Sequence, residues 1–453
     1  MTLILGWPDA TENTSRIGFR PAVKSQRKTD APVRANNGES HWLCAAPTGA
    51  GKTRGFVIPQ LLDYPGSAVV VDVKGEIAQV TARYRRQISE VLVIDPFKTV
   101  TQGGGTFNPL AHLDTDDPDY ADDIFTLSDL FNNQTIVKDR FWDDSAQNVI
   151  AGLMAAVVHL AKKSGKDAAY FHEIHERFHT ENRMYELAKM LDLNGDLPPL
   201  ASAFIGQFLS TNETTRASIA AVVAQQLRML ASPGVQHSFA GDTGAVDRLI
   251  EGRPVTVYVV LRPDRLSSHS GFVRIILTAI MQRLMRRITR PHHPTLFLVD
   301  EAAQLGKLAS LETAVTLGRG YGIRVAMLVQ SLSQLERAYG EGHKVFLENM
   351  ALMTMGPPNN MAASRALAEF GFGDVTAVAV HALTRGQVMV KDAGVPTRRL
   401  RKLDYLGDKL FAGRFDPNPA YGPPCDNSGE QLRLFGGYDR AVATRGTSWR
   451  KTR

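Results

Sequence analysis

The segment Ala46–Thr53, which reads APTGAGKT, constrains the fold of this chain more than any other feature. It follows a short apolar run at 42–44 and precedes apolar positions, so it predicts a strand, a glycine-rich loop and a helix in succession. Gly49 and Gly51 allow backbone N–H groups to face an anion, and the helix directs the positive end of its dipole at the same point. The pattern predicts a phosphate-binding loop made of Pro47, Thr48, Gly49, Ala50, Gly51, Lys52 and Thr53.

Two residues at the end of this loop carry the expected chemistry. Lys52 is predicted to reach the β- and γ-phosphates of ATP, and the Thr53 hydroxyl to hold Mg²⁺. The strict pattern begins with glycine, where this chain has Ala46, a residue small enough for the tight turn. The alternative is a glycine-rich turn that binds nothing, and Gly-Lys-Thr after a strand argues against it.

A second segment, PTLFLVDEAA at 294–303, supplies acids for the same site. Its apolar run 296–299 is typical of a strand buried on both faces of a parallel sheet, and ligands bind at the carboxyl ends of such strands. Asp300 is therefore predicted to support Mg²⁺, and Glu301 to orient and polarise the attacking water. The alternative is a strand that ends in an exposed acidic turn.

The next apolar run, 325–329, predicts a neighbouring strand that ends at Gln330. Gln330 is a candidate sensor of the γ-phosphate, or else an ordinary strand-end hydrogen-bonding residue. Arg319 lies between the two strands on a glycine-flanked segment. It is a candidate for neutralising charge in the transition state, supplied in oligomeric ATPases by the next subunit. The alternative for Arg319 is a surface turn.

Composition sets wider bounds. The 453 residues are sufficient for two or three domains, and the net charge of +6 favours a polyanionic partner without establishing one. The two cysteines give no disulfide framework. No apolar run approaches the ~18 residues of a membrane-spanning helix. We therefore expect a cytoplasmic chain.

The order of predicted elements indicates an α/β fold with a mainly parallel sheet and an inserted all-α block. Strands and helices alternate up to about residue 112, and only helical patterns follow until about 250. Strand-like runs occur at 41–46, 67–73, 90–95, 254–261, 294–299, 323–329 and 351–355. Helical patterns occur at 119–131, 141–163, 168–192, 197–209, 214–230 and 271–290.

The remaining segments carry weaker signals. Residues 1–40 are polar and basic and are interpreted as a loosely ordered arm that can include a short strand, and 413–453 as a largely disordered tail. The basic cluster PTRRLRK at 396–402 either contacts DNA or is solvated surface, the second being the more common case. His172, His175 and His179 share one helical face, but their spacing does not favour a zinc site.

With these motifs, the chain resembles the type IV secretion coupling proteins, the TraG/TraD group of conjugative DNA transfer ATPases. The resemblance covers roughly 42–360 and rests most specifically on VVVDVKGEI and FNPL, which a generic P-loop enzyme does not need. The motifs, in order, are APTGAGKT, VVVDVKGEI (69–77), VIDPF (93–97), FNPL (107–110), FWDDSAQNVI (141–150), LFLVDEAAQLGKL (296–308) and GRGYGIRVAMLVQSLSQL.

The resemblance implies a RecA-like P-loop NTPase domain at 41–112 and 250–412 with an all-α domain inserted at 113–249. It implies a homo-hexamer that engages DNA and its relaxase, or another secretion substrate, and delivers them to the type IV secretion channel. ATP and Mg²⁺ are the implied cofactors. Arg319 resembles the arginine that acts across the subunit interface, and Gln330 the γ-phosphate sensor. Asp72, Lys74 and Glu76 match a family motif to which we assign no chemistry.

Two other functions remain open at this stage. One is a helicase-like, DNA-dependent ATPase not tied to secretion, although no second RecA-like strand series and no QxxGRxGR segment is present. The other is a scaffold with a vestigial nucleotide site, against which the intact Lys52, Thr53, Asp300 and Glu301 argue.

Overall fold

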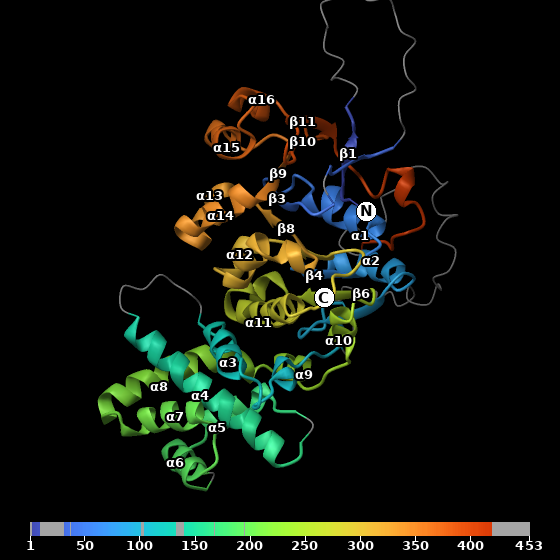
Figure 1. The fold of residues 1–453 in the computed structure, drawn as a ribbon. Coiled ribbons are helices and arrows are strands. Elements are labelled where there is room, and N and C mark those ends of the chain that lie inside the picture. The colour runs from blue at the N-terminus through green and yellow to red at the C-terminus, as the bar shows by residue number, and fades with distance from the viewer. Residues whose placement is uncertain are drawn as a thin grey trace, which may run out of the picture.

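A single 11-stranded sheet forms the centre of the molecule (Figure 1). The computed structural model describes residues 2–9, 31–36, 38–100, 104–132, 140–166, 168–193 and 195–418. The strand order is β2-β1-β11-β10-β9-β3-β8-β7-β4-β6-β5, and the seven strands from β9 to β5 run parallel. These seven are β3 (His41–Ala45), β4 (Ala68–Asp72), β5 (Glu90–Ile94), β6 (Val255–Val260), β7 (Thr295–Val299), β8 (Ile323–Val329) and β9 (Met350–Met355).

All seven strands predicted from apolar runs are confirmed to within one residue at each end. Their side chains are buried almost without exception because helices cover both faces of the sheet. On one face, Trp42 and Val70 pack with α1 (Ile58–Asp63) and α2 (Glu76–Arg85). On the other, Leu43 and Val71 share a core with α11 (Leu266–Met285) and α12 (Ala309–Thr316).

The other four strands extend the sheet in antiparallel fashion, and the prediction had allowed only for one short strand within residues 1–40. They are β1 (Ile4–Pro8), β2 (Val33–Arg34), β10 (Gln387–Lys391) and β11 (Arg398–Arg401). Ile4 in β1 is fully buried, so the interpretation of 1–40 as a loosely ordered arm is wrong for residues 4–8. The arm's basic residues between 10 and 30 lie outside the described residues.

The end of the described chain is also fixed to the sheet side of the molecule. Asp416 forms an ion pair with Arg83 of α2, with 2.5 Å between the Oδ1 and Nε atoms. The expectation of a disordered tail beginning at 413 is therefore wrong for residues 413–418. Residues 419–453 of that predicted tail lie outside the described residues.

Between β5 and β6, the described residues form helices and turns, as the periodicity predicted. This helical block occupies the lower part of Figure 1, and its core is continuous with that on the α11 face of the sheet. The boundaries of the predicted inserted domain at 113 and 249 stay a prediction. The helices are α3 (Tyr120–Asp129), α4 (Phe141–Lys163), α5 (Phe171–Phe178), α6 (Arg183–Leu193), α7 (Pro199–Ser210), α8 (Glu213–Leu227), α9 (Pro233–Ser238) and α10 (Ala245–Ile250).

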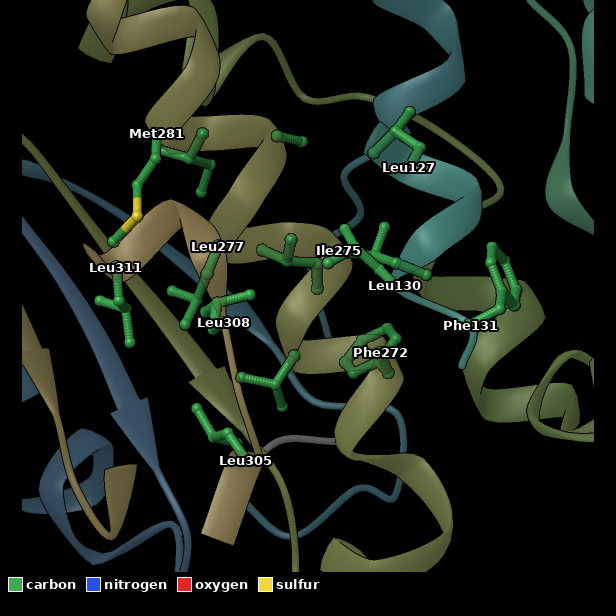
Figure 2. Packing of buried hydrophobic residues seen from close by; sticks show 14 of the residues in the cluster. Leu127, Leu130, Phe131, Phe272, Ile275, Leu277, Met281, Leu305, Leu308 and Leu311 are labelled. Atoms are coloured by element: carbon green, nitrogen blue, oxygen red, sulfur yellow. The ribbon is translucent and has the colours of Figure 1, made fainter. Parts of the chain in front are cut away.

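Helix α11 joins the helical block to the sheet. Figure 2 shows Ile275 of α11 near Leu130 after α3, while Leu277 and Met281 lie toward Leu308 and Leu311 at the start of α12. The same helix therefore packs against both units. Beyond β8, the chain continues through α13 (Leu332–Tyr339), α14 (His343–Asn349), α15 (Met361–Leu367) and α16 (Ala377–His381).

The contact between α11 and its two neighbours also contains a buried arginine. Arg274 is 1% exposed, and its Nη2 donates to the carbonyl oxygens of Leu130 and Asn132, each at 2.8 Å. Its Nη1 donates to the Leu305 carbonyl at 3.3 Å. One guanidinium thus bonds the end of α3 to the segment that follows Glu301.

Candidate nucleotide-binding site

The loop after β3 adopts the conformation that an anion-binding nest requires. Gly49 and Gly51 have φ angles of 78° and 84°, in the left-handed region that glycine adopts without strain. Ala46 is not among the residues with positive φ, which is why alanine is tolerated where the strict pattern has glycine. Lys52 is buried, and its Nζ donates to the Ala46 carbonyl at 2.8 Å across the loop.

The two predicted acids follow β7 directly and enter the same cavity as Lys52. Burial and the neighbouring Glu301 and Asp72 raise the pKa of Asp300 to about 7, while Lys52 acts in the opposite direction. Glu301 has φ 50°, an uncommon conformation for a residue with a side chain and one that clusters at functional sites. The protein therefore concentrates negative charge where a divalent cation would offset it.

Gln330 lies at the end of β8 and contacts the second acid. Its Nε2 donates to Glu301 Oε2 at 3.1 Å, and its backbone N–H is held by Gln334 Oε1 at 3.1 Å. The structure thus brings together Lys52, Asp300, Glu301 and Gln330 at the carboxyl edge of three parallel strands.

Asp72, whose chemistry was left unassigned, has a structural task in this site. Its carboxylate accepts hydrogen bonds from the backbone N–H groups of Lys74, Gly75 and Ala78 at 2.8–3.2 Å, which caps the start of α2. Burial raises the pKa of Asp72 to about 6 against these bonds. Lys74 and Glu76, from the same motif, line the cavity.

A cavity of about 690 Å³ lies over the loop and the acids, within the usual range for ligand sites. Its far wall comes from the segment around β11, which sequence reasoning did not place at the site. Lys402, at the end of the basic cluster 396–402, is part of this wall instead of a solvated surface. The wall residues are Arg385, Gly386, Arg401, Lys402, Leu403, Asp404, Tyr405, Leu406 and Asn418.

The residues of the cavity fit a magnesium nucleoside triphosphate. The nest at Gly49–Gly51 and the Lys52 ammonium offer donors to phosphate oxygens. The half-buried Thr53 hydroxyl and the Asp300 carboxylate offer the oxygen ligands that Mg²⁺ prefers. The size, charge and donor set of the cavity therefore agree with ATP and Mg²⁺ as the cofactors.

Arg319 lies apart from these residues. It sits in the 3-10 turn Gly318–Tyr321 before β8, at the amino edge of the sheet, next to His41. The seven residues of β8 lie between Arg319 and Gln330, so the two residues are separated by a strand roughly 23 Å long. Arg319 is exposed and does not line its own chain's cavity.

The three histidines of the 172–179 segment do not converge on one point. His172 stacks on Tyr170, while the rings of His175 and His179 stack on each other with 4.0 Å between centroids. Their separate contacts are those of side chains on a helix surface.

The fold and the site define a P-loop NTPase, with its nucleotide edge at the carboxyl ends of a parallel sheet. The family model for type IV secretory system conjugative DNA transfer matches residues 12–383. The chain belongs to this family.

Individual relatives agree with that assignment. The chain is 28% identical over 309 residues to the conjugal transfer protein TraG of Agrobacterium fabrum, covering 67% of this chain and 46% of that one. The chain spans about half the length of the curated relatives it matches. Among the described residues, none of the helices is long and apolar enough to cross a membrane.

Solved structures show the same fold. The bacterial conjugative coupling protein TrwBdeltaN70 in its unbound form superimposes with a TM-score of 0.63 at 16% identity, covering 82% of this chain and 87% of that one. TrwB in complex with ADP and Mg²⁺ superimposes with a TM-score of 0.62 at 17% identity, covering 81% and 85%.

Proposed function

We propose that this chain is an ATP-hydrolysing motor of conjugative DNA transfer. The observation that carries the proposal is that Lys52, Asp300 and Glu301 line one cavity, with Gln330 hydrogen-bonded to Glu301. Family membership and the ADP–Mg²⁺ complex of TrwB support the choice of nucleotide. A scaffold with a vestigial site would not need a hydrogen-bonded carboxylate beside a buried lysine.

The residues divide the reaction between them. Lys52 and the nest hold the phosphates, and Thr53 and Asp300 hold Mg²⁺, which supplies charge neutralisation for the leaving phosphate oxygens when bound. Glu301 accepts a proton from the attacking water, and Gln330 fixes the orientation of the Glu301 carboxylate through its 3.1 Å hydrogen bond.

Arg319 acts on the site of a neighbouring copy. Its position about a strand length from its own cavity leaves it no part in hydrolysis within one chain. Its exposed neighbours Leu317 and Tyr321, 63% and 39% exposed, give the turn an apolar surface suited to a subunit contact. A ring in which each amino edge faces the next carboxyl edge completes every site, and we propose a homo-hexamer.

The proposed partners follow from the family. They are DNA, bound without sequence preference, a relaxase or other secretion substrate, and components of the type IV secretion channel. The net charge of +6 is compatible with a DNA backbone as one of them.

Steady-state ATP hydrolysis, measured with and without single-stranded DNA at two protein concentrations, tests this function. We expect turnover that rises with DNA and protein concentration and is lost in Glu301→Gln. Turnover that ignores both DNA and protein concentration would contradict the motor. DNA unwinding without a response to a relaxase would favour the helicase-like alternative.

A mixing experiment tests the shared site. Glu301→Gln and Arg319→Ala are each inactive alone, but a mixed ring contains interfaces that combine an intact Glu301 with an intact Arg319. In a random 1:1 mixture about a quarter of the interfaces are complete, so activity returns to roughly that fraction. No recovery, in protein shown to exchange subunits, would place Arg319 outside the site.

A further inference from the structure

Lys402 lies directly against the phosphate-binding loop. Its Nζ donates to the Ala50 carbonyl at 2.9 Å and to the Arg385 carbonyl at 2.9 Å. Ala50 is the residue between Gly49 and Gly51, the two glycines that give the loop its nest conformation. The lysine therefore bonds to the backbone of the loop at its centre.

The aliphatic stem of Lys402 is equally close to the helix that follows the loop. A Cβ atom added at Gly55 would stand 2.9 Å from Lys402 Cγ and 3.1 Å from the Leu403 carbonyl oxygen. A Cβ at Gly51 would stand 3.2 Å from Lys402 Nζ. The lack of a side chain at Gly51 and Gly55 is what allows Lys402 to approach the loop and the start of the following helix.

A second pair of side chains holds the same two segments together. Arg54 donates through Nε and Nη2 to the Asp404 carboxylate at 2.7 and 2.6 Å. The backbone N–H of Lys402 is itself bonded to the Gly386 carbonyl at 2.7 Å. Partial burial and the nearby Arg54 lower the pKa of Lys402. Lys402 is thus held in place over Ala50 by backbone and by packing.

The geometry of a peptide bond gives this contact its consequence. In a trans peptide the C=O of one residue and the N–H of the next point in opposite directions. By holding the Ala50 carbonyl, Lys402 therefore also fixes the direction of the Gly51 N–H, one of the donors that a loop of this conformation offers to an anion. Without that donor, the Ala50–Gly51 peptide is freer to rotate, since the rotation changes φ of Gly51 and glycine adopts either sign of φ.

We infer that Lys402 is a positioning residue of the phosphate-binding loop, which aims the Gly51 N–H at the nucleotide phosphate by holding the Ala50 carbonyl. The inference rests on the proposed nucleotide site. It adds to that site a residue that is distant from the loop in sequence. Lys402 is the last residue of the basic cluster at 396–402, and the inference gives it a role other than DNA contact.

Lys402→Met tests the inference because it removes the ammonium and keeps the stem over Gly55. Lys391→Met is the matched control, since Lys391 lies on the neighbouring β10 in an ion pair with Asp374, at 2.8 Å. We measure dissociation constants for Mg²⁺–ADP and Mg²⁺–ATPγS by calorimetry and the thermal midpoint without nucleotide. Lys402→Gln, whose side chain is too short to reach both carbonyls, gives the same measurement if Lys402→Met does not fold.

We expect Lys402→Met to weaken ADP and ATPγS by the same factor, roughly tenfold, as for the loss of one well-aligned phosphate donor. Unchanged ADP affinity in Lys402→Met, with normal binding by the wild type and the control, would overturn the inference alone. A loss confined to ATPγS would also overturn it, because it would indicate a direct contact with the γ-phosphate. Failure of the wild type to bind ADP would instead contradict the proposed function.

Discussion

The polar side chains at the two edges of the parallel sheet differ in burial and in hydrogen bonding. At the carboxyl edge, Lys52 and Glu301 line a cavity and are hydrogen-bonded within the protein, Lys52 to the Ala46 carbonyl and Glu301 to Gln330. At the amino edge, Arg324 is 1% exposed, and within the described part of the chain none of its three guanidinium nitrogens has a hydrogen-bond partner. The first edge is arranged to receive a charged ligand, whereas the second buries a guanidinium that has no hydrogen-bond partner among the described residues.

His41 makes the contrast sharper because it lies on β3, the strand that leads into the phosphate-binding loop. Its Nδ1 accepts a hydrogen bond from the Val325 N–H at 3.0 Å, which requires an unprotonated nitrogen. Burial and the nearby Arg319 and Arg324 lower the pKa of His41 to about 4. One strand thus carries a neutral imidazole at one end and an anion-binding loop at the other, and Arg319 alone of these amino-edge cations is exposed.

The largest effect should come from Arg319→Ala, which tests whether the amino edge contributes to chemistry at all. Turnover should fall about 10³-fold, the usual value of an arginine supplied to a phosphoryl transfer site. Affinity for Mg²⁺–ADP should stay within about twofold, because Arg319 does not line its own cavity. Arg86→Ala, an exposed arginine at the end of α2, is the control and should keep wild-type turnover. Equal turnover of the two variants would remove the amino edge from catalysis.

Glu301→Gln should lower turnover roughly a hundredfold and leave nucleotide binding in place. The amide oxygen of the new side chain still accepts the hydrogen bond from Gln330, so the local structure persists while the base is lost. Single-turnover hydrolysis beside calorimetric ADP binding separates the two effects. A variant that fails to bind ADP would show that Glu301 shapes the site in place of activating water.

Arg274→Met should destabilise the protein by roughly 2 kcal/mol, because it leaves buried carbonyl groups without donors. Burial lowers the pKa of Arg274 only to about 10, so the group is charged at neutral pH and makes its bonds in that form. Urea unfolding measures the loss, with Ser267→Ala, a change at an exposed position on the same helix, as the comparison. A midpoint equal to that of the comparison would mean that the carbonyls find other partners.

The smallest effect concerns pH and the amino edge. The folded-state pKa of His41, about 4, lies below the unfolded value of 6.5, so the unfolded state binds the proton first. The contribution of His41 to stability should therefore fall by about 1 kcal/mol between pH 7 and pH 5.5, while Asp72 and Asp300, whose pKa values are raised in the folded state, act in the opposite direction. In His41→Asn, which keeps an acceptor near the Nδ1 position, stability at pH 5.5 relative to that at pH 7 should be about 1 kcal/mol higher than the same difference in the wild type, as read from urea unfolding at the two pH values. An unchanged difference would assign the acid sensitivity to other groups.

The parts of the fold that were predictable are those with a local signal. The run SAVVVDV predicts β4 because a strand buried on both faces needs only apolar side chains. Likewise, the helix predicted at 141–163 matches α4 at both ends, Phe141 and Lys163. Each of these elements is specified by its own residues.

Strands β1 and β11 were missed because they lack such a signal. β11 reads RRLR, and only Leu400 of its four residues is buried, so its pattern is that of a basic surface. β1 contains Gly6 and Pro8, which weaken a strand prediction. The two strands pair with each other across almost the whole chain, as Trp7 does with Arg401, and each also pairs with a strand nearer in sequence, β1 with β2 and β11 with β10.

The candidate site divides in the same manner. Lys52, Asp300, Glu301 and Gln330 were predictable because the carboxyl ends of parallel strands meet at one edge. The wall from Arg385 to Leu406 was not, since it reaches the cavity through antiparallel pairing that no local pattern encodes.

The three carbonyl bonds of Arg274 have a thermodynamic consequence beyond stability. They connect Leu305, four residues after Glu301, with Leu130 and Asn132 at the end of α3. A nucleotide that shifts the segment at Leu305 therefore strains or moves the end of α3 through the bonds of Arg274. By reciprocity, a molecule that binds the helical block and displaces α3 must alter nucleotide affinity by the same factor that nucleotide alters its own binding.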